Sequence, residues 1–377
     1  MRAAALVKKQ HVELIDVPSP YLGPHDVRVR PAAVGVCGTD FHIAAGESNF
    51  HLDEHGRPIP FEASPQILGH EITGTVIERG AAVKDLAVGT RVVVDQGRNC
   101  RSERREPPCE YCASGHSHQC EHYQEHGITG LPGGFAEELV VPAVNAVPIG
   151  GDLNFEVAAL AEPLGCVLHC LDAGERARTR YRLSGQHDRV RTAVVLGAGP
   201  AGLLFVQALR SLLAFDGALL VSDPSPHKRA LAQALGAEAV PPEQLTALVR
   251  ERSHGRRAEY VVEATGCGHV FGDVPNLIRK QGTLLLYGVG HGGAAMELLN
   301  PLQWRELALV TSVGASGGFD ADGRPSVYRR ALGLLANNAV RVDSLLTHRY
   351  RGLAAVPRAL GDDHRRPDYV KGMTLLP

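Results

Sequence analysis

The sequence predicts two domains of different fold class: an all-β, barrel-like domain, followed by an α/β domain with a doubly wound parallel sheet. Its 377 residues exceed what one hydrophobic core usually supports. Residues 1–150 contain short strand-like segments separated by Pro and Gly. From Phe155 onward, apolar strands alternate with helices, which is typical of a parallel sheet covered on both faces.

The strands predicted in the first domain are β-branched or alternate apolar and polar residues, and turn residues bound each of them. Two insertions interrupt the pattern, a polar loop over about 47–66 and a Cys/His-rich lobe over about 97–127. Loops of this length inside a compact domain are usually functional or organised by a metal. The predicted strands cover residues 12–17, 27–36, 72–78, 91–95 and 135–141.

The second domain is predicted from apolar periodicity that switches between strand and helix. We expect helices over 155–171, 201–213, 227–235 and 274–279, and strands over 192–196, 218–222, 260–263 and 283–287. Beyond residue 306 the pattern is mixed, with a helix over 327–337 and a strand over 369–376.

Composition excludes several classes of function. Hydrophobic residues make up 44% and charged residues 21% of the chain, and the net charge of −2 offers no basic surface for nucleic acid or membrane. No segment reaches the apolar length of a membrane span, and no export signal is recognised. Eight cysteines without such a signal favour reduced thiols, so we expect a cytoplasmic protein.

A glycine motif predicts a dinucleotide site. Gly197-x-Gly199-x-x-Gly202 follows the strand-like segment 194–196 and opens a helix, so its backbone can approach a pyrophosphate. Asp223 ends the next strand, where a carboxylate meets ribose hydroxyls and repels a 2′-phosphate. This favours NAD over NADP, although His227, Lys228 and Arg229 could soften the preference. The predicted cofactor-binding residues are Gly197, Gly199, Pro200, Ala201, Gly202, Asp223, Lys228 and Lys371.

A catalytic zinc is predicted from Cys37, His70 and Glu162, which come from three separated segments. Zinc bound by one thiolate, one imidazole and one carboxylate is formally near neutral and can polarise an alcohol oxygen. Glu71 as a permanent fourth ligand would weaken this Lewis acid. We therefore expect Glu71 beside the metal or as a transient ligand, although its adjacency to His70 makes direct coordination possible. Each residue alone could be structural, but their coincidence with a nucleotide fold favours the metal.

A second, structural zinc is predicted in the cysteine lobe, where Cys109-x2-Cys112-x7-Cys120 follows Cys100 after a long gap. Histidine could replace one thiolate, or the lobe histidines could be solvated loop residues, which we favour. These histidines are His116, His118, His122 and His126. The remaining cysteines, Cys166, Cys170 and Cys267, are expected to be buried thiols.

Together the motifs resemble the zinc-dependent medium-chain dehydrogenase/reductase superfamily over essentially the whole chain. They are Cys37-Gly-Thr-Asp-Phe-His42, Gly69-His-Glu-Ile-Thr-Gly74, the cysteine lobe, Glu162-Pro-Leu-Gly165, the glycine motif and Asp223. Glu162-Pro163 in place of a third catalytic cysteine is similar to the sorbitol, threonine and glucose dehydrogenase branch. The chain departs from that branch in its long Cys37-to-His70 interval and in the expanded first gap of the lobe.

This resemblance implies a GroES-like catalytic domain over 1–158 with the zinc lobe at about 97–127, a Rossmann NAD-binding domain over 159–305, and a segment over 306–377 that returns to the catalytic domain. By the same resemblance, Thr39 touches the reacting oxygen and Asp40 supports the ligand histidine. His42 is the outer member of a proton relay, and Glu71 is the sometimes ligating glutamate. An ordinary surface histidine is the structural alternative for His42.

The predicted reaction is hydride transfer from a secondary alcohol to NAD, with zinc polarising the alcohol. The proton is expected to leave through Thr39 and a cofactor ribose hydroxyl to His42. The polar insertion favours a polyol, sugar or cyclitol, and threonine or another amino alcohol is the alternative. The rivals are a non-enzymatic NAD-binding sensor and a zinc-free reductase. The resemblance also implies a homodimer or homotetramer.

Overall fold

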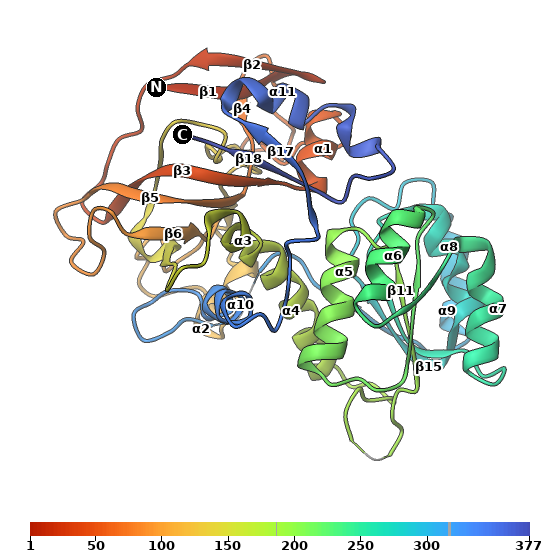
Figure 1. Cartoon of the computed structure of the whole chain (residues 1–377). Helices are drawn as coiled ribbons and strands as arrows, with labels where there is room; N and C mark the ends of the chain where they lie inside the picture. The colour runs from red at the N-terminus through yellow and green to blue at the C-terminus, as the bar shows by residue number, and fades with distance from the viewer. Residues whose placement is uncertain (186, 316–317) are drawn as a thin grey trace. The chain divides into compact units, whose positions relative to one another are not determined.

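The computed structural model describes residues 1–185, 187–315 and 318–377. These residues form two compact units (Figure 1). The first unit combines Met1–Gly165 with Ala315–Pro377, and the second is Cys166–Gly314. The chain thus divides after Gly165 and after Gly314. The boundaries expected from the sequence were residues 158 and 305.

The first unit is built on a sheet with strand order β10-β6-β5-β3-β18-β17, in which β9 also pairs with β3. A smaller sheet has the order β2-β1-β4, and a short hairpin, β7-β8, belongs to the cysteine lobe. Alternating burial along β3 shows why it forms a central strand. The strands are β1 (Arg2–Lys8), β2 (His11–Asp16), β3 (Asp26–Val36), β4 (Gln66–Ile67), β5 (Glu71–Arg79), β6 (Arg91–Val94), β7 (Gly97–Arg98), β8 (Gln124–Glu125), β9 (Leu139–Pro142), β10 (Ala146–Pro148), β17 (Leu346–Arg351) and β18 (Lys371–Leu375).

Short helices complete this unit, and its apolar core gathers side chains from the strands, from α1 and from the C-terminal segment. The C-terminal residues return to the same sheet, because β18 pairs antiparallel with β3 and parallel with β17. The helices are α1 (Gly38–Ala44), α2 (Glu110–Ala113), α3 (Phe155–Ala159), α10 (Ser326–Ala336) and α11 (Val356–Ala359), and α4 (Ala161–Arg176) begins in this unit.

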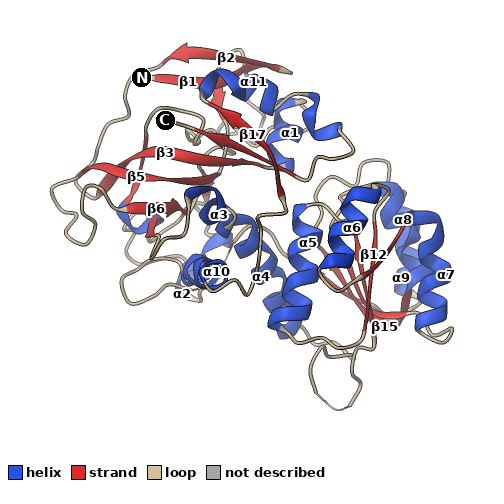
Figure 2. Ribbon diagram, in the orientation of Figure 1, coloured by secondary structure: helices blue, strands red, loops and turns tan. Residues whose placement is uncertain are grey.

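The second unit contains a parallel sheet with the order β13-β12-β11-β14-β15-β16. This is the strand order of a Rossmann fold, and Figure 2 shows helices on both sides of the sheet. The strands are β11 (Thr192–Leu196), β12 (Ala218–Ser222), β13 (Glu238–Val240), β14 (Ala258–Glu263), β15 (Ile278–Leu286) and β16 (Ala308–Thr311). The helices are α5 (Pro200–Gln207), continued by a π-helical segment over Ala208–Leu212, then α6 (Pro226–Ala234), α7 (Pro242–Arg252), α8 (Gly268–Leu277) and α9 (Leu299–Gln303).

The predicted fold class is confirmed, while some predicted elements are shifted. The helix predicted over 274–279 has the wrong bounds. Helix α8 runs from Gly268 to Leu277, and Ile278 already belongs to a strand that pairs with β14. The strand predicted from Phe135 starts only at Leu139. Phe135 instead bonds through its backbone to Leu68 and Ala4, outside the main sheet.

The expectation that no segment matches a membrane span needs correction. The helical stretch Phe155–Arg176 is long and apolar enough by length and composition alone. However, 78% of its apolar window is buried inside the protein, as in the core helix of a globular fold. Its apolar length is therefore explained by internal packing.

Candidate active site and metal centres

The register of the central sheet brings the predicted metal ligands together. Cys37 directly follows β3, and His70 directly precedes β5. The two strands pair antiparallel, with Gly35 opposite Glu71. On the other side of β3, Gly372 of β18 lies opposite Val36, which places Lys371 at the same end of the sheet.

Asp40 organises the first two ligands. Its carboxylate is fully buried and accepts hydrogen bonds from the backbone N–H of Cys37 (2.8 Å) and of Gly69 (3.1 Å). The same carboxylate lies 3.4 Å from His70 Nδ1, leaving Nε2 for a metal. Burial lowers the pKa of His70, but the charges of Asp40 and Cys37 outweigh this effect and raise it well above the usual value.

Glu71 is fully buried and is held by a charge partner. Its Oε1 accepts a hydrogen bond from Lys371 Nζ, and its Oε2 has no hydrogen-bond partner among the described residues. Burial lowers the pKa of Lys371, but the Glu71 carboxylate more than offsets this and raises it, so Lys371 stays charged. Gly35 leaves room for the carboxylate, since a Cβ there would lie 1.9 Å from Oε2.

Glu162 lies in the first turn of α4 and is almost fully buried. Its Oε1 accepts a hydrogen bond from Gln96 Nε2 at 2.9 Å, and Gln96 Oε1 accepts one from Tyr328 Oη at 2.5 Å. Glu162 also acts electrostatically on Lys371, which places it in the surroundings of the site. Gln96 and Tyr328 were missed in the sequence, because no local motif marks a residue that orients a carboxylate from another segment.

Three donor groups fit a metal ion. One ligand atom each of Cys37, His70 and Glu71 lies within 4.8 Å of the other two. Glu71 Oε2 is buried and has no hydrogen-bond partner among the described residues, so it is available to a metal ion. A thiolate, an imidazole and a carboxylate are ligands that zinc accepts. Glu162 is outside this closely spaced group. Its ligation, like the choice between Glu71 and Glu162 as the carboxylate ligand, stays a prediction.

The predicted proton relay starts on the short helix α1. Thr39 Oγ1 lies 3.8 Å from Cys37 Sγ. His42 is exposed on the same helix, and its Nδ1 lies 2.7 Å from Glu47 Oε2. The hydrogen bond and charge of His42 lower the pKa of Glu47. Glu47 belongs to the polar insertion, so its pairing with His42 could not be read from the motif.

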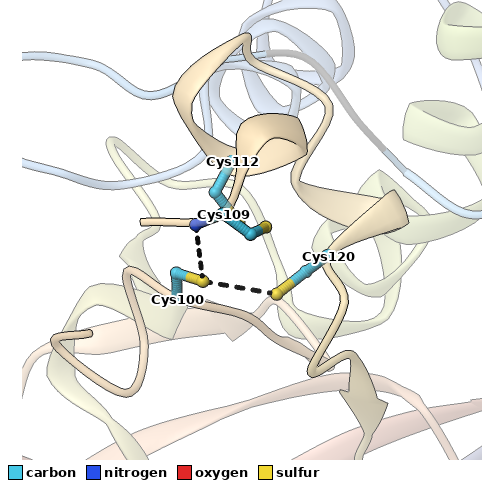
Figure 3. A group of neighbouring side chains, drawn as sticks. All are labelled: Cys100, Cys109, Cys112 and Cys120. Atoms are coloured by element: carbon cyan, nitrogen blue, oxygen red, sulfur yellow. Dashed lines mark hydrogen bonds between the residues drawn. The ribbon is translucent and has the colours of Figure 1, made fainter. Parts of the chain in front are cut away.

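The cysteine lobe brings four sulfurs together (Figure 3). They lie within 4.8 Å of one another, and the Sγ atoms of Cys100 and Cys120 are 3.6 Å apart. Backbone N–H groups of Cys109 and His122 donate to the sulfurs of Cys100 and Cys120, both at 3.4 Å. Backbone N–H groups lower the pKa of Cys109 to about 6, whereas burial raises the pKa of Cys112 and of Cys120. Four thiols thus suit a closed structural zinc without a histidine ligand.

The remaining cysteines differ from one another. Cys170 is buried as expected, and burial raises its thiol pKa to about 11. Cys166 is half-buried, whereas Cys267 is exposed, so the expectation of burial is wrong for Cys267. Cys267 is the N-cap residue of α8, in the loop between β14 and α8.

The glycine motif forms the turn between β11 and α5. Gly197 adopts φ +95°, and a Cβ on Gly202 would lie 1.9 Å from the Gly197 carbonyl oxygen, so both positions need glycine. Gly199 is the N-cap of α5, and Pro200 and Ala201 form its first turn, where unpaired N–H groups can meet a pyrophosphate. Strand β12, the next strand along the chain, ends beside this turn.

Asp223 is buried after β12 and accepts backbone N–H bonds from Ala198 and Ser225, both at 2.8 Å. Lys228 lies in the first turn of α6, close in sequence to Asp223. Lys371 belongs to the other unit, where it pairs with Glu71. The cofactor roles of Lys228 and Lys371 stay predictions.

Comparison with known proteins identifies the family. Residues 23–151 match the family model described as alcohol dehydrogenase GroES-like domain, and residues 200–338 match that of zinc-binding dehydrogenase. D-arabinitol dehydrogenase 1 of Uromyces fabae is 30% identical over 93% of this chain and 90% of its own length. The chain belongs to the zinc-dependent medium-chain dehydrogenase/reductase superfamily. This dehydrogenase resembles the sorbitol and threonine dehydrogenase branch, as its motifs predicted.

Other relatives carry different substrate names. The L-galactonate-5-dehydrogenase of Escherichia coli is 30% identical over 92% of this chain and 91% of its own length. The L-threonine 3-dehydrogenase of Pyrococcus furiosus is 29% identical over 90% of this chain and 88% of its own length. A Sinorhizobium meliloti structure described as a zinc-binding dehydrogenase bound to NADP is 28% identical, covers 99% of this chain and 98% of its own, and has a TM-score of 0.76. The enzyme is therefore a zinc-dependent alcohol dehydrogenase that uses a nicotinamide dinucleotide.

Proposed function

We propose that this dehydrogenase oxidises a secondary alcohol of a polyol, sugar or cyclitol with NAD. The observation that carries the proposal is the convergence of Cys37, His70 and Glu71 at one end of the central sheet, in a chain that also holds the glycine turn and Asp223. The thiolate, imidazole and carboxylate set argues against a purely structural NAD-binding role, because a sensor needs no Lewis acid.

The residues that would hold the catalytic zinc are Cys37, His70 and a carboxylate from Glu71 or Glu162. When bound, zinc would polarise the substrate hydroxyl and favour its ionised form. Asp40 fixes the imidazole so that Nδ1 faces the carboxylate and Nε2 faces the metal position. Lys371 offsets the charge of Glu71, which limits the negative charge around the ligand set.

Thr39 and His42 would carry the substrate proton toward solvent. Thr39 lies beside Cys37, and the imidazole of His42 is exposed on the same helix, where it can exchange a proton with solvent. The carboxylate of Glu47 can stabilise the imidazolium that forms on His42. His42→Ala should slow turnover most at low pH, where bulk base is scarce, while leaving zinc content unchanged.

We propose NAD as the physiological cofactor. Asp223 keeps both carboxylate oxygens engaged with backbone N–H groups, so it stays fixed where the adenosine ribose is expected. A fixed negative charge disfavours a 2′-phosphate. Asp223→Ser should raise the ratio of kcat/KM with NADP to kcat/KM with NAD by about tenfold or more, in line with the loss of one charge contact.

A hydroxyl-rich substrate is supported by two of the relatives, which are named for D-arabinitol and L-galactonate. The polar insertion adds support, since Asn49 fixes it by hydrogen bonds with Ile59, His51 and Gln66. Threonine is the second candidate, because another relative is an L-threonine 3-dehydrogenase.

A substrate panel tests the proposal. NAD reduction by the zinc-loaded enzyme would be compared across pentitols, hexitols, aldonates, cyclitols and L-threonine. Highest kcat/KM with a polyol, sugar acid or cyclitol supports the proposal. Highest kcat/KM with L-threonine would replace it by the amino-alcohol alternative, and chelator-insensitive activity would favour a zinc-free reductase.

We also propose a homo-oligomer and a cytoplasmic location. Strand β16 is an edge strand of the parallel sheet, and it exposes Leu309, with Val313 and Trp304 exposed nearby in sequence. Exposed apolar groups on a sheet edge favour pairing with a second copy. All eight cysteines are free and none is paired in a disulfide. Cysteines that bind zinc must stay reduced, and a cytoplasmic location would keep them so.

A further inference from the structure

The loop that follows strand β15 is rich in glycine. Four of the six residues from Gly288 to Gly293 are glycine, and a segment of this composition has little intrinsic order. The two side chains in the loop belong to Val289 and His291, and Val289 is 66% exposed. His291 is therefore the side chain that can fix this loop to the rest of the second unit.

His291 is bound to a buried carboxylate. Its Nε2 lies 2.7 Å from Oε2 of Glu263, which is fully buried at the end of β14. Since a carboxylate only accepts hydrogen bonds, Nε2 is the ring nitrogen that carries the hydrogen. The imidazole also packs edge-on against the Phe271 ring of α8, with ring centroids 5.6 Å apart. Contacts with two different elements thus fix the orientation of His291.

The same carboxylate binds the loop that follows β14. Glu263 Oε1 accepts hydrogen bonds from the backbone N–H groups of Thr265 (2.7 Å) and Gly266 (3.2 Å), and from the Thr265 hydroxyl. The backbone N–H of His291 donates to the Gly266 carbonyl at 2.5 Å. The N–H of Gly288 donates to the Glu263 carbonyl at 2.9 Å. Glu263 therefore joins the loops that follow β14 and β15.

The joined loops lie next to the glycine turn of the dinucleotide site. Leu196, the last residue of β11, pairs with Ser222 of β12 on one side and with Glu263 of β14 on the other. The Thr265 side chain packs against the turn itself, since a Cβ on Gly197 would lie 2.9 Å from Thr265 Cγ2. The joined loops are thus on the side of the turn opposite to β12.

The strand order indicates which half of the dinucleotide these loops meet. The order reverses between β11 and β14, and ligands of such sheets bind outside the carboxyl ends of the strands at this point. The glycine turn after β11 meets the pyrophosphate, and Asp223 after β12 meets the adenosine ribose. The other half of the molecule must then extend past the ends of β14 and β15. We therefore expect the nicotinamide half beside residues 288–293.

We propose that His291, fixed by Glu263, positions residues 288–293 against the nicotinamide half of the coenzyme. A loop that is already fixed does not have to be ordered when the coenzyme binds, so the pair contributes to the affinity for this half and not for the adenosine half. His291 is a positioning residue, because it acts through the loop and not on the reacting atoms. This role does not depend on which alcohol the enzyme oxidises.

Binding constants for NADH and ADP, measured by calorimetry on the zinc-loaded enzyme, test the proposal. ADP carries the adenosine and both phosphates but lacks the nicotinamide half. We expect His291→Asn to raise the Kd of NADH by about tenfold and to change the Kd of ADP by less than about twofold. Asparagine suits this position, because His291 has a left-handed φ of 43° that asparagine tolerates, while its shorter side chain does not reach Glu263.

Two further variants separate the hydrogen bond from other effects of the substitution. His291→Gln keeps an N–H that can reach Glu263, so it should restore the Kd of NADH to within about threefold of wild type. His254→Asn makes the same substitution at an exposed histidine that also has a left-handed φ, of 51°. His254 precedes β14, at the end of the strand opposite to Glu263, so both Kd values should stay unchanged.

Three results would overturn the proposal. The first is an NADH Kd that is equal in His291→Asn and wild type. The second is an equal loss of NADH and ADP binding, which would mean that the pair supports the whole turn. The third is a His291→Gln variant that binds NADH as weakly as His291→Asn, because the Nε2 hydrogen bond would then not matter.

Hydrogen exchange on the wild-type enzyme gives a check that needs no variant. Because the loop is fixed before the coenzyme arrives, the amides of Gly288 and His291 should be protected from exchange without NADH, and NADH should add little protection. Rapid exchange of both amides in the free enzyme, followed by strong protection on NADH binding, would contradict a loop held in place by His291.

Discussion

At the scale of single residues, one buried carboxylate arranges most of the predicted metal site. Asp40 contacts the backbone at Cys37 and Gly69 and faces His70 Nδ1, so it joins the two separated segments that carry Cys37 and His70. The motif predicted Asp40 as a support for His70. Its bonds to two backbone groups could not be predicted, because they depend on how β3 and β5 pair.

Replacing Asp40 should impair zinc binding while the fold persists. We expect Asp40→Asn to weaken zinc affinity by about 10-fold to 100-fold, because the imidazole loses its orienting charge and one acceptor oxygen. Competition with a chromophoric chelator measures this affinity. Asp16→Asn, an exposed change on β2, serves as the matched control. Equal zinc affinity in wild type and Asp40→Asn would refute the positioning role.

His126 should make the protein sensitive to acid. Burial lowers its pKa to about 4, partly opposed by the hydrogen bond of Nδ1 to the Pro132 carbonyl. The unfolded chain, with a histidine pKa near 6.5, then binds more protons than the folded one between about pH 6.5 and 4. Stability is therefore fully present above pH 6.5 and falls as the pH drops toward 4.

The His126 prediction is checked by urea unfolding at several pH values. His126→Gln should flatten the decline of unfolding free energy between pH 6.5 and 4, whereas His55→Gln, at an exposed position, should not. A decline of the same steepness in wild type and His126→Gln would assign the acid sensitivity to other groups.

At the scale of elements, strands that form continuous apolar runs were predictable, while their pairing partners were not. The strands over 192–196 and 218–222 were placed at their observed bounds. Strand β17 and helix α7 were missed, although Leu245, Leu248 and Val249 of α7 follow the i, i+3, i+4 spacing of a helix. The Gln96–Glu162 and His42–Glu47 contacts were missed because tertiary packing, and not a local motif, brings these residues together.

The cysteine lobe should depend on its own zinc. Because it has little apolar core besides its cysteines and Tyr123, Cys120→Ser should lose one zinc per chain and lower the unfolding temperature by at least about 5 °C. Metal analysis and calorimetry measure both effects. The catalytic zinc should remain, and a variant that keeps its full zinc content would contradict a tetrathiolate site.

The exposed edge of the parallel sheet should mediate self-association. Leu309→Lys places a charge on β16, which should shift the protein toward monomer in sedimentation velocity runs at micromolar concentration. Val88→Lys, at a similarly exposed apolar position of the first unit, is the control. An unchanged sedimentation coefficient for Leu309→Lys would place the interface elsewhere.

At the scale of the whole molecule, the two units divide the chemistry. The ligand set lies in the first unit, and the glycine turn with Asp223 lies in the second. The sequence could predict this division, because each unit carries its own motif and its own period of apolar residues. It could not identify the substrate, since the relatives with similar motifs are named for different alcohols.

Zinc content, measured together with alcohol-dependent NAD reduction, tests the central claim most directly. Wild type should hold about two zinc per chain, and Cys37→Ser should hold about one and lose activity. The lobe variant Cys120→Ser provides the comparison, since it should also hold about one zinc yet retain the active-site metal. Full zinc content and full activity in Cys37→Ser would contradict a catalytic zinc at this end of the sheet.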